Sequence, residues 1–187
     1  MEDPAFERLE TPRLVLRRFR ADDVDAFAAY RSDPEVARYQ GWEPPYSRAE
    51  AERFVRSMSR RGPGRPGTWF QFAVAPRPDG ALVGDCGLRT SRREARRGEL
   101  GFTFARMHQR RGYATEAAAA VLAYAFGTLG MVRIEARIDG RNERAARLLV
   151  RLGMKHEATR EGVGADGSET ELAWAALAAC WRPPAAG

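Results

Sequence analysis

Cysteine and histidine are scarce in this sequence of 187 residues, and their scarcity argues against whole classes of site. The two cysteines, Cys86 and Cys180, lie far apart without spaced partners, which argues against a disulfide scaffold or a zinc site. We expect both to be buried free thiols. With only His108 and His156 present, a histidine-rich metal centre is also unsupported, and no metal is predicted.

Long apolar runs are missing as well. The most apolar stretch, residues 117–129, is mainly alanine and is shorter than the roughly 20 residues that a membrane-spanning helix needs. The acidic start of the chain, Met1-Glu2-Asp3, lacks the basic-then-apolar order of a signal peptide. The sequence therefore predicts a cytoplasmic protein with no membrane contact.

Lysine is almost absent, although the chain is basic. Lys155 is the only lysine among 31 basic residues, and the net charge is +6. The arginines are spread along the whole chain, and such usage can reflect a genomic coding bias as easily as a binding adaptation. We therefore favour a solvated basic surface over a nucleic-acid groove, while attraction to an acidic partner stays open.

The length and a hydrophobic content of 44% suit one compact domain with a substantial core. We expect this domain to span residues 1–182 and residues 183–187 to form a disordered tail. The hydrophobic pattern predicts a mixed α/β fold, a sheet with helices on its faces. Strands are expected at residues 14–19, 69–75, 81–88, 99–104, 133–138, 155–160 and 170–174. Helices are expected to begin near residues 21 and 48 and to cover 114–129 and 142–152.

Local signals set several boundaries. Pro34 ends the first helix, because proline disfavours helical geometry in its predecessor. Ser47 and Glu50 form a capping box for the second helix. The turn Pro78-Asp79-Gly80 predicts an antiparallel hairpin, and the sequence RRGPGRPG at residues 60–67 predicts a loop with room for mobility.

The segment RMHQRRGYATE, residues 106–116, joins a predicted strand to a predicted buried helix. The first N–H groups of a helix lack intrahelical partners and the dipole adds about half a positive charge there, so this junction can bind an anion. Arg106, Arg110 and Arg111 precede that end, where exposed cations are disfavoured by roughly 0.3–1 kcal/mol each. A polyphosphate would explain them, and Gly112 would let the backbone approach it. Solvated arginines beside a simple turn glycine are the alternative, and local physics leaves both open.

This segment resembles the signature of the GNAT superfamily of N-acyltransferases. Residues 109–114, QRRGYA, fit its Gln/Arg-x-x-Gly-x-Gly/Ala pattern between a strand and a helix. Asn142 with the apolar residues up to Gly153 resembles the Asn-led helix of the family. Residues 9–14 and 32–36 resemble one branch, the ribosomal-protein alanine N-acetyltransferases. The likeness extends from about residue 9 to residue 181, with four motifs in order.

The resemblance implies the GNAT acyl-CoA N-acyltransferase fold, with a twisted, mostly antiparallel sheet of about seven strands flanked by helices. It also implies acetyl-CoA as cosubstrate, with its pyrophosphate on the backbone amides of the first motif. The strand end before that motif would pair with the pantetheine arm and polarise the thioester carbonyl, and Asn142 would bond the pantetheine amide, cap its helix, or do both. The cofactor-binding residues implied are Phe104, Ala105, Arg106, Gln109, Arg110, Arg111, Gly112, Tyr113, Ala114, Thr115 and Asn142.

Three positions depart from the family pattern. Arg110 stands where glycine is frequent, so the loop is expected to be stiffer. Ala145 replaces a frequent serine, which removes a hydroxyl that could protonate the leaving thiolate. Met154 replaces the usual aromatic residue. Without the serine, the thiolate would take its proton from solvent.

Attack of an amine on a thioester requires a neutral amine and donors for the tetrahedral oxyanion. Glu99 is the first candidate for the base, because it lies on the strand beside the cofactor and similar family members use a carboxylate near there. The alternative for Glu99 is a solvated edge carboxylate, and His108 and Asp85 are further candidates. Trp42 and Tyr46, between the first two helices, are candidates to shape the acceptor pocket, with core packing as their alternative.

Three functions remain open from the sequence. The branch implies an acetyltransferase for a protein N-terminal α-amine. A small amine, such as an aminoglycoside-like compound or a polyamine, is a second acceptor class. A non-catalytic module that binds CoA or nucleic acid is the third, although an intact phosphate motif argues against a specific nucleic-acid binder. The sequence leaves the choice between monomer and homodimer open.

Overall fold

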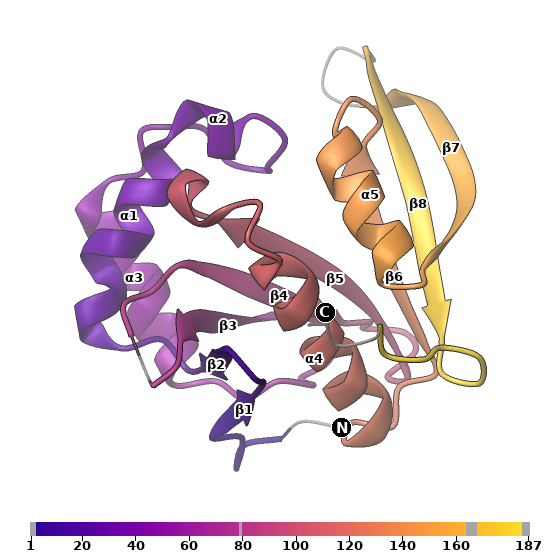
Figure 1. Ribbon diagram of the computed structural model, residues 1–187, viewed down its shortest axis with the longest axis horizontal. Helices are drawn as coiled ribbons and strands as arrows, with labels where there is room; N and C mark the ends of the chain where they lie inside the picture. The colour runs from indigo at the N-terminus through magenta and orange to yellow at the C-terminus, as the bar shows by residue number, and fades with distance from the viewer. Residues whose placement is uncertain (1–2, 79, 164–167, 185–187) are drawn as a thin grey trace.

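The computed structural model of the protein describes residues 3–78, 80–163 and 168–184, and its eight strands belong to one sheet. The strand order is β1-β2-β3-β4-β5-β6-β8-β7, with every neighbouring pair antiparallel except β5 and β6 (Figure 1). The prediction of a mostly antiparallel sheet flanked by helices is therefore confirmed, with eight strands against about seven. The strands are β1 (Arg8–Glu10), β2 (Leu14–Arg17), β3 (Trp69–Pro76), β4 (Gly84–Thr90), β5 (Arg97–Phe104), β6 (Arg133–Asp139), β7 (Lys155–Val163) and β8 (Glu169–Leu177).

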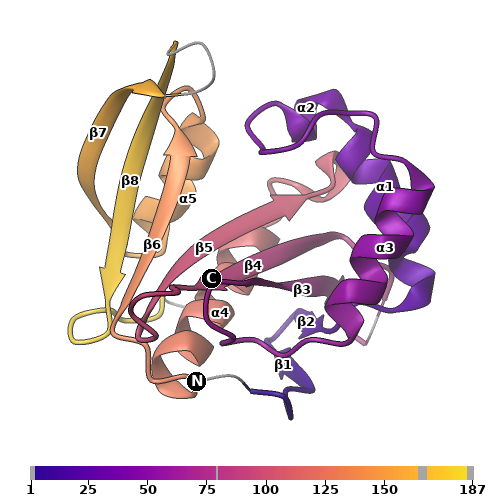
Figure 2. The same cartoon turned by 180° about the vertical axis from the view of Figure 1, so that it is seen from behind.

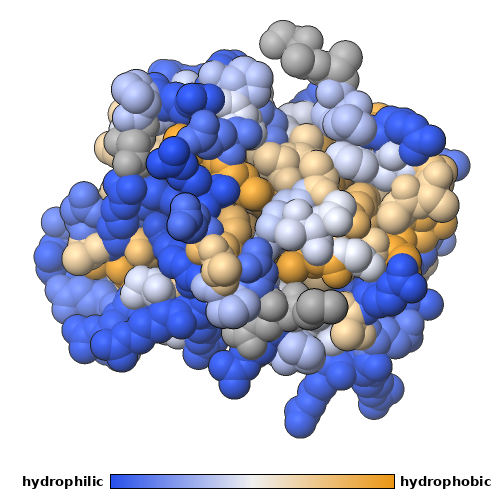
Figure 3. All heavy atoms as spheres, turned by 90° about the horizontal axis from the view of Figure 1, so that it is seen from below, coloured by the Kyte–Doolittle hydropathy of each residue, from blue (hydrophilic) through white to orange (hydrophobic). Residues whose placement is uncertain are grey.

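The helices divide between the two faces of the sheet. One core cluster joins the sheet to α4 and α5, and a second joins the opposite face to α1 and α3. Four large apolar side chains are exposed among the described residues: Met107, Val132, Val150 and Leu177. On the face shown in Figure 3, apolar areas lie among larger hydrophilic ones. The helices are α1 (Val24–Ser32), α2 (Pro34–Ala37), α3 (Arg48–Ser59), α4 (Tyr113–Gly127) and α5 (Glu143–Arg151), with 3-10 turns η1 (Ala21–Asp23) and η2 (Arg106–His108).

The sheet opens between β5 and β6. Their parallel pairing covers three positions and ends at Glu99 opposite Glu135, although β5 continues to Phe104 and β6 to Asp139. Beyond that point β6, β7, β8 and α5 stand apart from the strands β1 to β5 (Figures 1 and 2). This divergence creates the space in which the candidate site lies.

Sequence signals at helix ends were largely correct. Ser47 and Glu50 form the predicted capping box of α3. Asp33 and Pro34 end α1 as predicted, but they also begin α2, a one-turn helix that the sequence analysis missed. The Asp33 side chain accepts a hydrogen bond from Glu35 N, and Pro34 occupies the first turn, where a missing N–H is harmless.

Other expectations were wrong or incomplete. Cys86 is buried, but Cys180 is exposed. The short edge strand β1 was not predicted, and the strand expected from residue 81 begins at Gly84. Residues 60–67 lie between α3 and β3 as the predicted loop, but residues 62–64 are buried and Pro63 O accepts a hydrogen bond from Asp3 N at 2.8 Å, contacts that the sequence did not predict.

Some expectations fall on undescribed positions. Asp79 of the hairpin turn, residues 164–167 and tail residues 185–187 lie outside the described residues, although the hairpin pairing of β3 with β4 is antiparallel as predicted. Over the described residues, no helix is long and apolar enough to cross a membrane. The cytoplasmic location and the extent of the domain stay predictions.

A buried ion pair fastens β2 to the turn before α1. Arg17 Nη1 and Nη2 donate to the two carboxylate oxygens of Asp23 at 2.7 and 2.9 Å, and both side chains are buried. Asp23 also accepts a hydrogen bond from Arg20 N at 2.7 Å. Losing one member leaves a buried charge without its partner, which is costlier than losing both.

We expect Asp23→Asn to lower the free energy of unfolding by about 3–5 kcal/mol, measured by urea denaturation. Asp22→Asn is the matched control, because Asp22 is the exposed neighbour of Asp23. Its effect should stay within about 0.5 kcal/mol. Equal stabilities of the two variants would show that the buried pair does not stabilise this corner.

Candidate active site

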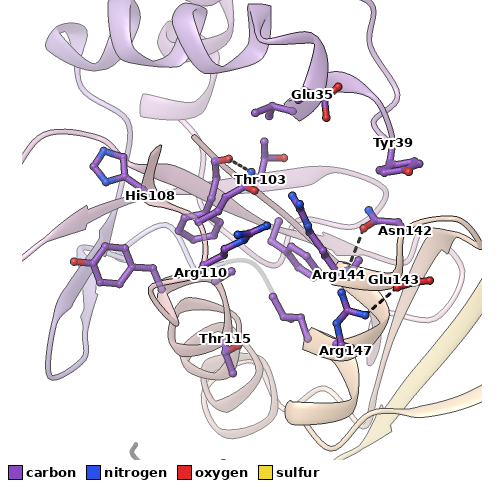
Figure 4. Close-up of a pocket in the computed structure, with 18 of the residues that line it drawn as sticks. Glu35, Tyr39, Thr103, His108, Arg110, Thr115, Asn142, Glu143, Arg144 and Arg147 are labelled. Carbon is purple, nitrogen blue, oxygen red and sulfur yellow. Dashed lines mark hydrogen bonds and ion pairs between the residues drawn. The ribbon is translucent and has the colours of Figure 1, made fainter. Parts of the chain in front are cut away.

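A cavity of about 760 Å³ lies beside the end of β5, beyond the point where the pairing of β5 with β6 ends. Its walls come from the end of β5, the first turn of α4, one face of α5, and α2 with the residues that follow it up to Gln40 (Figure 4). Nine of the eleven predicted cofactor-binding positions fall in the stretch from Phe104 to Ala114, and the structure brings most of that stretch to this cavity. The predicted residues that line it are Phe104, Gln109, Arg110, Gly112, Tyr113, Ala114, Thr115 and Asn142.

The backbone of β5 presents unpaired groups to this opening. Its odd-numbered residues bond to β4, as Ala105 N does to Val83 O at 3.0 Å, so its even-numbered residues point the other way. At Phe102 and Phe104 the ladder with β6 has already ended. The carbonyl of Phe104 accepts a hydrogen bond from Gln109 Nε2 at 3.0 Å. The register with β4 directs the Phe104 N–H away from β4, toward the side on which the pairing with β6 has ended. Of the predicted strand-end amides, Phe104 is therefore available and Ala105 is occupied.

The first turn of α4 lacks a side-chain cap. Its N-cap residue is Gly112, in the left-handed region at φ 79°, which glycine adopts without strain. A polar cap in place of glycine would stabilise the helix by only a few tenths of a kcal/mol, and its absence leaves the first N–H groups free. The space that a Cβ of Gly112 would occupy is taken by the Arg13 guanidinium, whose Nη2 would lie 3.0 Å from it. Arg13, which sequence analysis did not select, thus supports the turn from behind.

Glu116 locks this turn to the N-terminal strands. Its carboxylate accepts hydrogen bonds from Thr11 Oγ1 at 2.6 Å, Arg13 N at 3.0 Å and Arg13 Nε at 2.6 Å. Burial alone would raise the pKa of Glu116, but these donors outweigh it and hold the pKa below its ordinary value. A carboxylate near the helix N-terminus also suits the dipole.

Arginines line the cavity from the loop before α4 and from α5. Arg110, at the unusual φ of 61°, precedes α4, while Arg144, Arg147 and Arg151 share one face of α5. Arg147 Nη1 donates to Glu143 at 3.0 Å, and Arg151 Nε donates to Thr115 Oγ1 at 3.5 Å. The spacing 144, 147, 151 is a helical signal that sequence analysis did not use.

Two predicted arginines have other partners. Arg106 Nε lies 3.1 Å from Asp33 Oδ2, so Arg106 ties the end of β5 to α2. Arg111 contributes its carbonyl to Arg13 Nη1 at 3.0 Å. Neither residue, nor Ala105, lies among the residues that line the cavity. Their cofactor roles stay predictions.

Asn142 caps α5, which is one of the two roles predicted for it. Its Oδ1 accepts a hydrogen bond from Ala145 N at 3.1 Å. The residue also lines the cavity, so its amide nitrogen remains for a ligand. Ala145 is buried beneath it, and Met154, at the aromatic position of the family, is buried in the core.

A second cavity of about 450 Å³ adjoins the first and shares Arg38, Tyr39, Phe102 and Asn142 with it. Its far wall is formed by β6 and β8, with Asp139, Glu169 and Glu171 as acidic side chains. Two adjoining cavities with shared lining residues suit a reaction between two substrates.

Trp42 and Tyr46, the predicted acceptor residues, lie outside the lining of both cavities. They pack on Arg31, whose guanidinium carbon is 3.9 Å from the Trp42 ring centroid and 5.4 Å from that of Tyr46. Trp42 Nε1 also donates to Arg31 O at 3.1 Å. These contacts fix the loop that carries Tyr39, and direct acceptor binding by the two aromatics stays a prediction.

The candidate bases have different surroundings. Glu99 pairs with Arg89 Nη1 at 3.5 Å at the closed end of the opening and lies outside the lining of both cavities. Asp85 is buried, where its carboxylate accepts a short hydrogen bond from the Tyr30 hydroxyl, and burial raises its pKa. His108 lines the first cavity, and burial together with Arg111 lowers its pKa, so its imidazole is neutral at pH 7.

The chain matches the family model of the GNAT acetyltransferase domain over residues 13–155. The protein belongs to the GNAT acetyltransferase family. It is 32% identical over 152 residues to the uncharacterized N-acetyltransferase YoaA of Bacillus subtilis, covering 81% of this chain and 85% of that protein. It is 30% identical over 152 residues to the uncharacterized N-acetyltransferase p20 of Bacillus licheniformis, with 81% and 84% covered.

Solved structures agree with this family at the level of the fold. A GNAT-family acetyltransferase from Bacillus anthracis matches with a TM-score of 0.82 and 24% identity, covering 92% of this chain and 99% of that one. RimJ of Mycobacterium smegmatis, solved with CoA-disulfide, matches with a TM-score of 0.74 and 21% identity, covering 89% and 82%.

This GNAT protein is therefore an N-acetyltransferase, and GNAT enzymes use acetyl-CoA. Over the part of the chain that the structure describes, no cluster of three or more His, Cys, Asp or Glu side chains could hold a metal ion.

We expect Glu116→Gln to destabilise this GNAT domain at pH 7 by about 1.5–3 kcal/mol, because charged hydrogen bonds to Thr11 and Arg13 are lost. Since the folded-state pKa of Glu116 is lowered, its stabilisation is complete above the unfolded value of about 4.3 and is lost as the pH falls further. Urea unfolding at pH 7 and pH 3.5 should therefore show a stability difference between wild type and variant that shrinks in acid. Glu7→Gln, at an exposed position, is the control. A difference that does not change with pH would contradict the role of the carboxylate.

Proposed function

We propose that the protein transfers the acetyl group of acetyl-CoA to the α-amine of a protein N-terminus. The observation that carries the proposal is the opening between β5 and β6, which meets the uncapped first turn of α4 and the arginines of α5 at one cavity. Backbone donors, positive charge and an extended backbone edge are what a pyrophosphate and a pantetheine arm require.

The phosphate end of acetyl-CoA would lie against the first turn of α4. The N–H groups of residues 112–115 face the ligand there, and Arg110, Arg144, Arg147 and Arg151 neutralise its charge. This arrangement would explain why Arg110 stands where the helix dipole disfavours a cation.

The pantetheine arm would continue along the edge of β5. The arm can pair with the backbone groups of Phe102 and with the Phe104 N–H, as an added strand does, and its carbonyl groups can accept from the amide nitrogen of Asn142. The thioester carbonyl would then lie near the Phe104 N–H, which would stabilise the oxyanion by on the order of 3 kcal/mol. Because Ala145 stands in place of serine, the leaving thiolate would take its proton from the attacking nitrogen or from solvent.

The acceptor assignment rests on the resemblance of residues 9–14 and 32–36 to the ribosomal-protein alanine N-acetyltransferases. The second cavity supports it, because it extends away from the first along β6 and β8 and can accommodate the residues that follow an N-terminal amine. A small amine would need only the junction of the two cavities.

Calorimetry with acetyl-CoA should give saturable binding, and thiol release should report turnover with peptides that carry a free N-terminal alanine. A panel of polyamines and aminoglycosides in the same assay tests the small-amine acceptors. Binding without turnover of any amine would leave a CoA-binding module, and no binding at millimolar acetyl-CoA would refute the proposal.

Gly112→Ala tests the phosphate turn directly. The left-handed conformation costs other residues about 1–2 kcal/mol, which strains the turn, and the new Cβ would also displace the Arg13 guanidinium slightly. We expect the Kd for CoA to rise about tenfold or more, which corresponds to about 1.4 kcal/mol.

Gly127→Ala is the matched control for this variant, because it lies at the other end of α4 and nothing would lie within 4 Å of its added Cβ. Its Kd for CoA should equal that of wild type. Equal affinities of all three proteins would place the pyrophosphate elsewhere.

A further inference from the structure

Five carboxylates line the two cavities, and they differ in their partners. Four are paired with arginines: Glu143 with Arg147 at 3.0 Å, Asp139 with Arg141 at 2.5 Å, Glu169 with Arg141 at 3.8 Å, and Glu171 with Arg137 and Arg160 at 3.5 Å each. The fifth is Glu35 of α2, whose carboxylate makes no hydrogen bond or ion pair with any described residue. A carboxylate without an arginine keeps its full capacity to accept protons and hydrogen bonds.

The fold fixes the position of Glu35 without using its side chain. Asp33 Oδ1 accepts a hydrogen bond from Glu35 N at 3.0 Å, and Asp33 Oδ2 pairs with Arg106 Nε at 3.1 Å. The next two residues, Val36 and Ala37, are buried. Asp33 therefore anchors α2 to the end of β5, beside the strand segment that would hold the thioester.

Charge is divided across the cavity. Glu35 and Tyr39 lie on one side of it, and Arg110, Arg144 and Arg147 lie on the other (Figure 4). Arg38 shares the side of Glu35, but its guanidinium lies over the Tyr39 ring at 5.3 Å. One side thus suits the anionic cofactor, and the free carboxylate faces it from the side on which a cationic amine would be stabilised.

We propose that Glu35 is the catalytic carboxylate that receives the acceptor ammonium and takes its proton. This inference rests on the proposed acetyl transfer. Glu35 accepts a hydrogen bond from the ammonium and removes one N–H proton, which frees the nitrogen lone pair. That pair forms the N–C bond to the acetyl carbon while the carbonyl π electrons move to oxygen, near the Phe104 N–H. When they return, the C–S bond breaks, the thiolate takes a second proton from the nitrogen, and Glu35 releases its proton to solvent.

This assignment places the base on α2 rather than at Glu99. Glu99 is paired with Arg89 at the last position where β5 and β6 are paired, and it lines neither cavity. Glu35 lines the first cavity, as Phe104 does. Proximity to the reacting atoms is the first requirement of a general base.

Glu35→Gln keeps the shape of the side chain and removes the base. We expect kcat for a peptide amine to fall about 100-fold or more, within the range of general-base catalysis, while the Kd for CoA stays unchanged. An acceptor amine whose conjugate acid has a pKa far below the assay pH is already neutral. The rate of its acetylation should therefore fall much less in the variant. Glu43→Gln is the matched control, since Glu43 is exposed in the following loop and lines neither cavity.

The outcomes separate this proposal from the function on which it rests. Wild-type enzyme that binds CoA but acetylates no amine would overturn both. Active wild type with an equally active Glu35→Gln variant would overturn the role of Glu35 alone, as would a Glu99→Gln variant that loses activity while Glu35→Gln keeps it. A Glu35→Gln variant with a low kcat for the peptide amine and a near-normal kcat for the weakly basic amine would support the proposal.

Discussion

The interruption of one strand pairing is the constraint on which the site depends. The parallel ladder between β5 and β6 ends at Glu99 and Glu135, although both strands continue. Backbone groups in a sheet interior are normally paired, so the free groups at Phe102 and Phe104 exist only because the strands diverge. An extended ligand with its own amides can satisfy them. The second cavity and the unpaired Phe104 N–H follow from this divergence, and the proposed oxyanion donor and the proposed route between two substrates depend on them.

Ion pairs and hydrogen bonds hold the walls of the opening in place. Asp33 joins α2 to the end of β5 through Arg106, and Glu116 joins α4 to the N-terminal strands through Thr11 and Arg13. These contacts fix elements from distant parts of the sequence at fixed separations. A preorganised site needs such supports, because donors that must move into place stabilise a transition state less.

The sequence predicted the parts of this protein whose signals are local. Alternating and helical hydrophobic patterns located every main strand and helix except β1 and α2, which have three and four residues and leave little periodicity. The capping box of Ser47, the cap of Asn142 and the phosphate turn around Gly112 were also readable, because each depends on neighbours in the chain.

Features that depend on packing were not readable. The sequence suggested Glu99 as the base because of its strand, but the partner of a carboxylate is decided by folding, and Arg89 is ten residues away. The loop of residues 62–64 looked mobile from its glycines and prolines, yet the N-terminal segment covers it. Arg13 and Asp33 lie in the stretches 9–14 and 32–36 that resemble the branch, but only the assembled structure shows which partners they bind beside the cavity walls.

The contact between Arg13 and Glu116 also has a consequence for how the molecule is made. The two residues are 103 positions apart, so the phosphate turn cannot acquire its geometry from local sequence alone. Contacts of such long range form slowly, because a large loop must close first. During synthesis on the ribosome, β1 to β5 emerge before α4 does, and the anion-binding turn becomes competent only when the chain beyond Glu116 has docked on strands made much earlier.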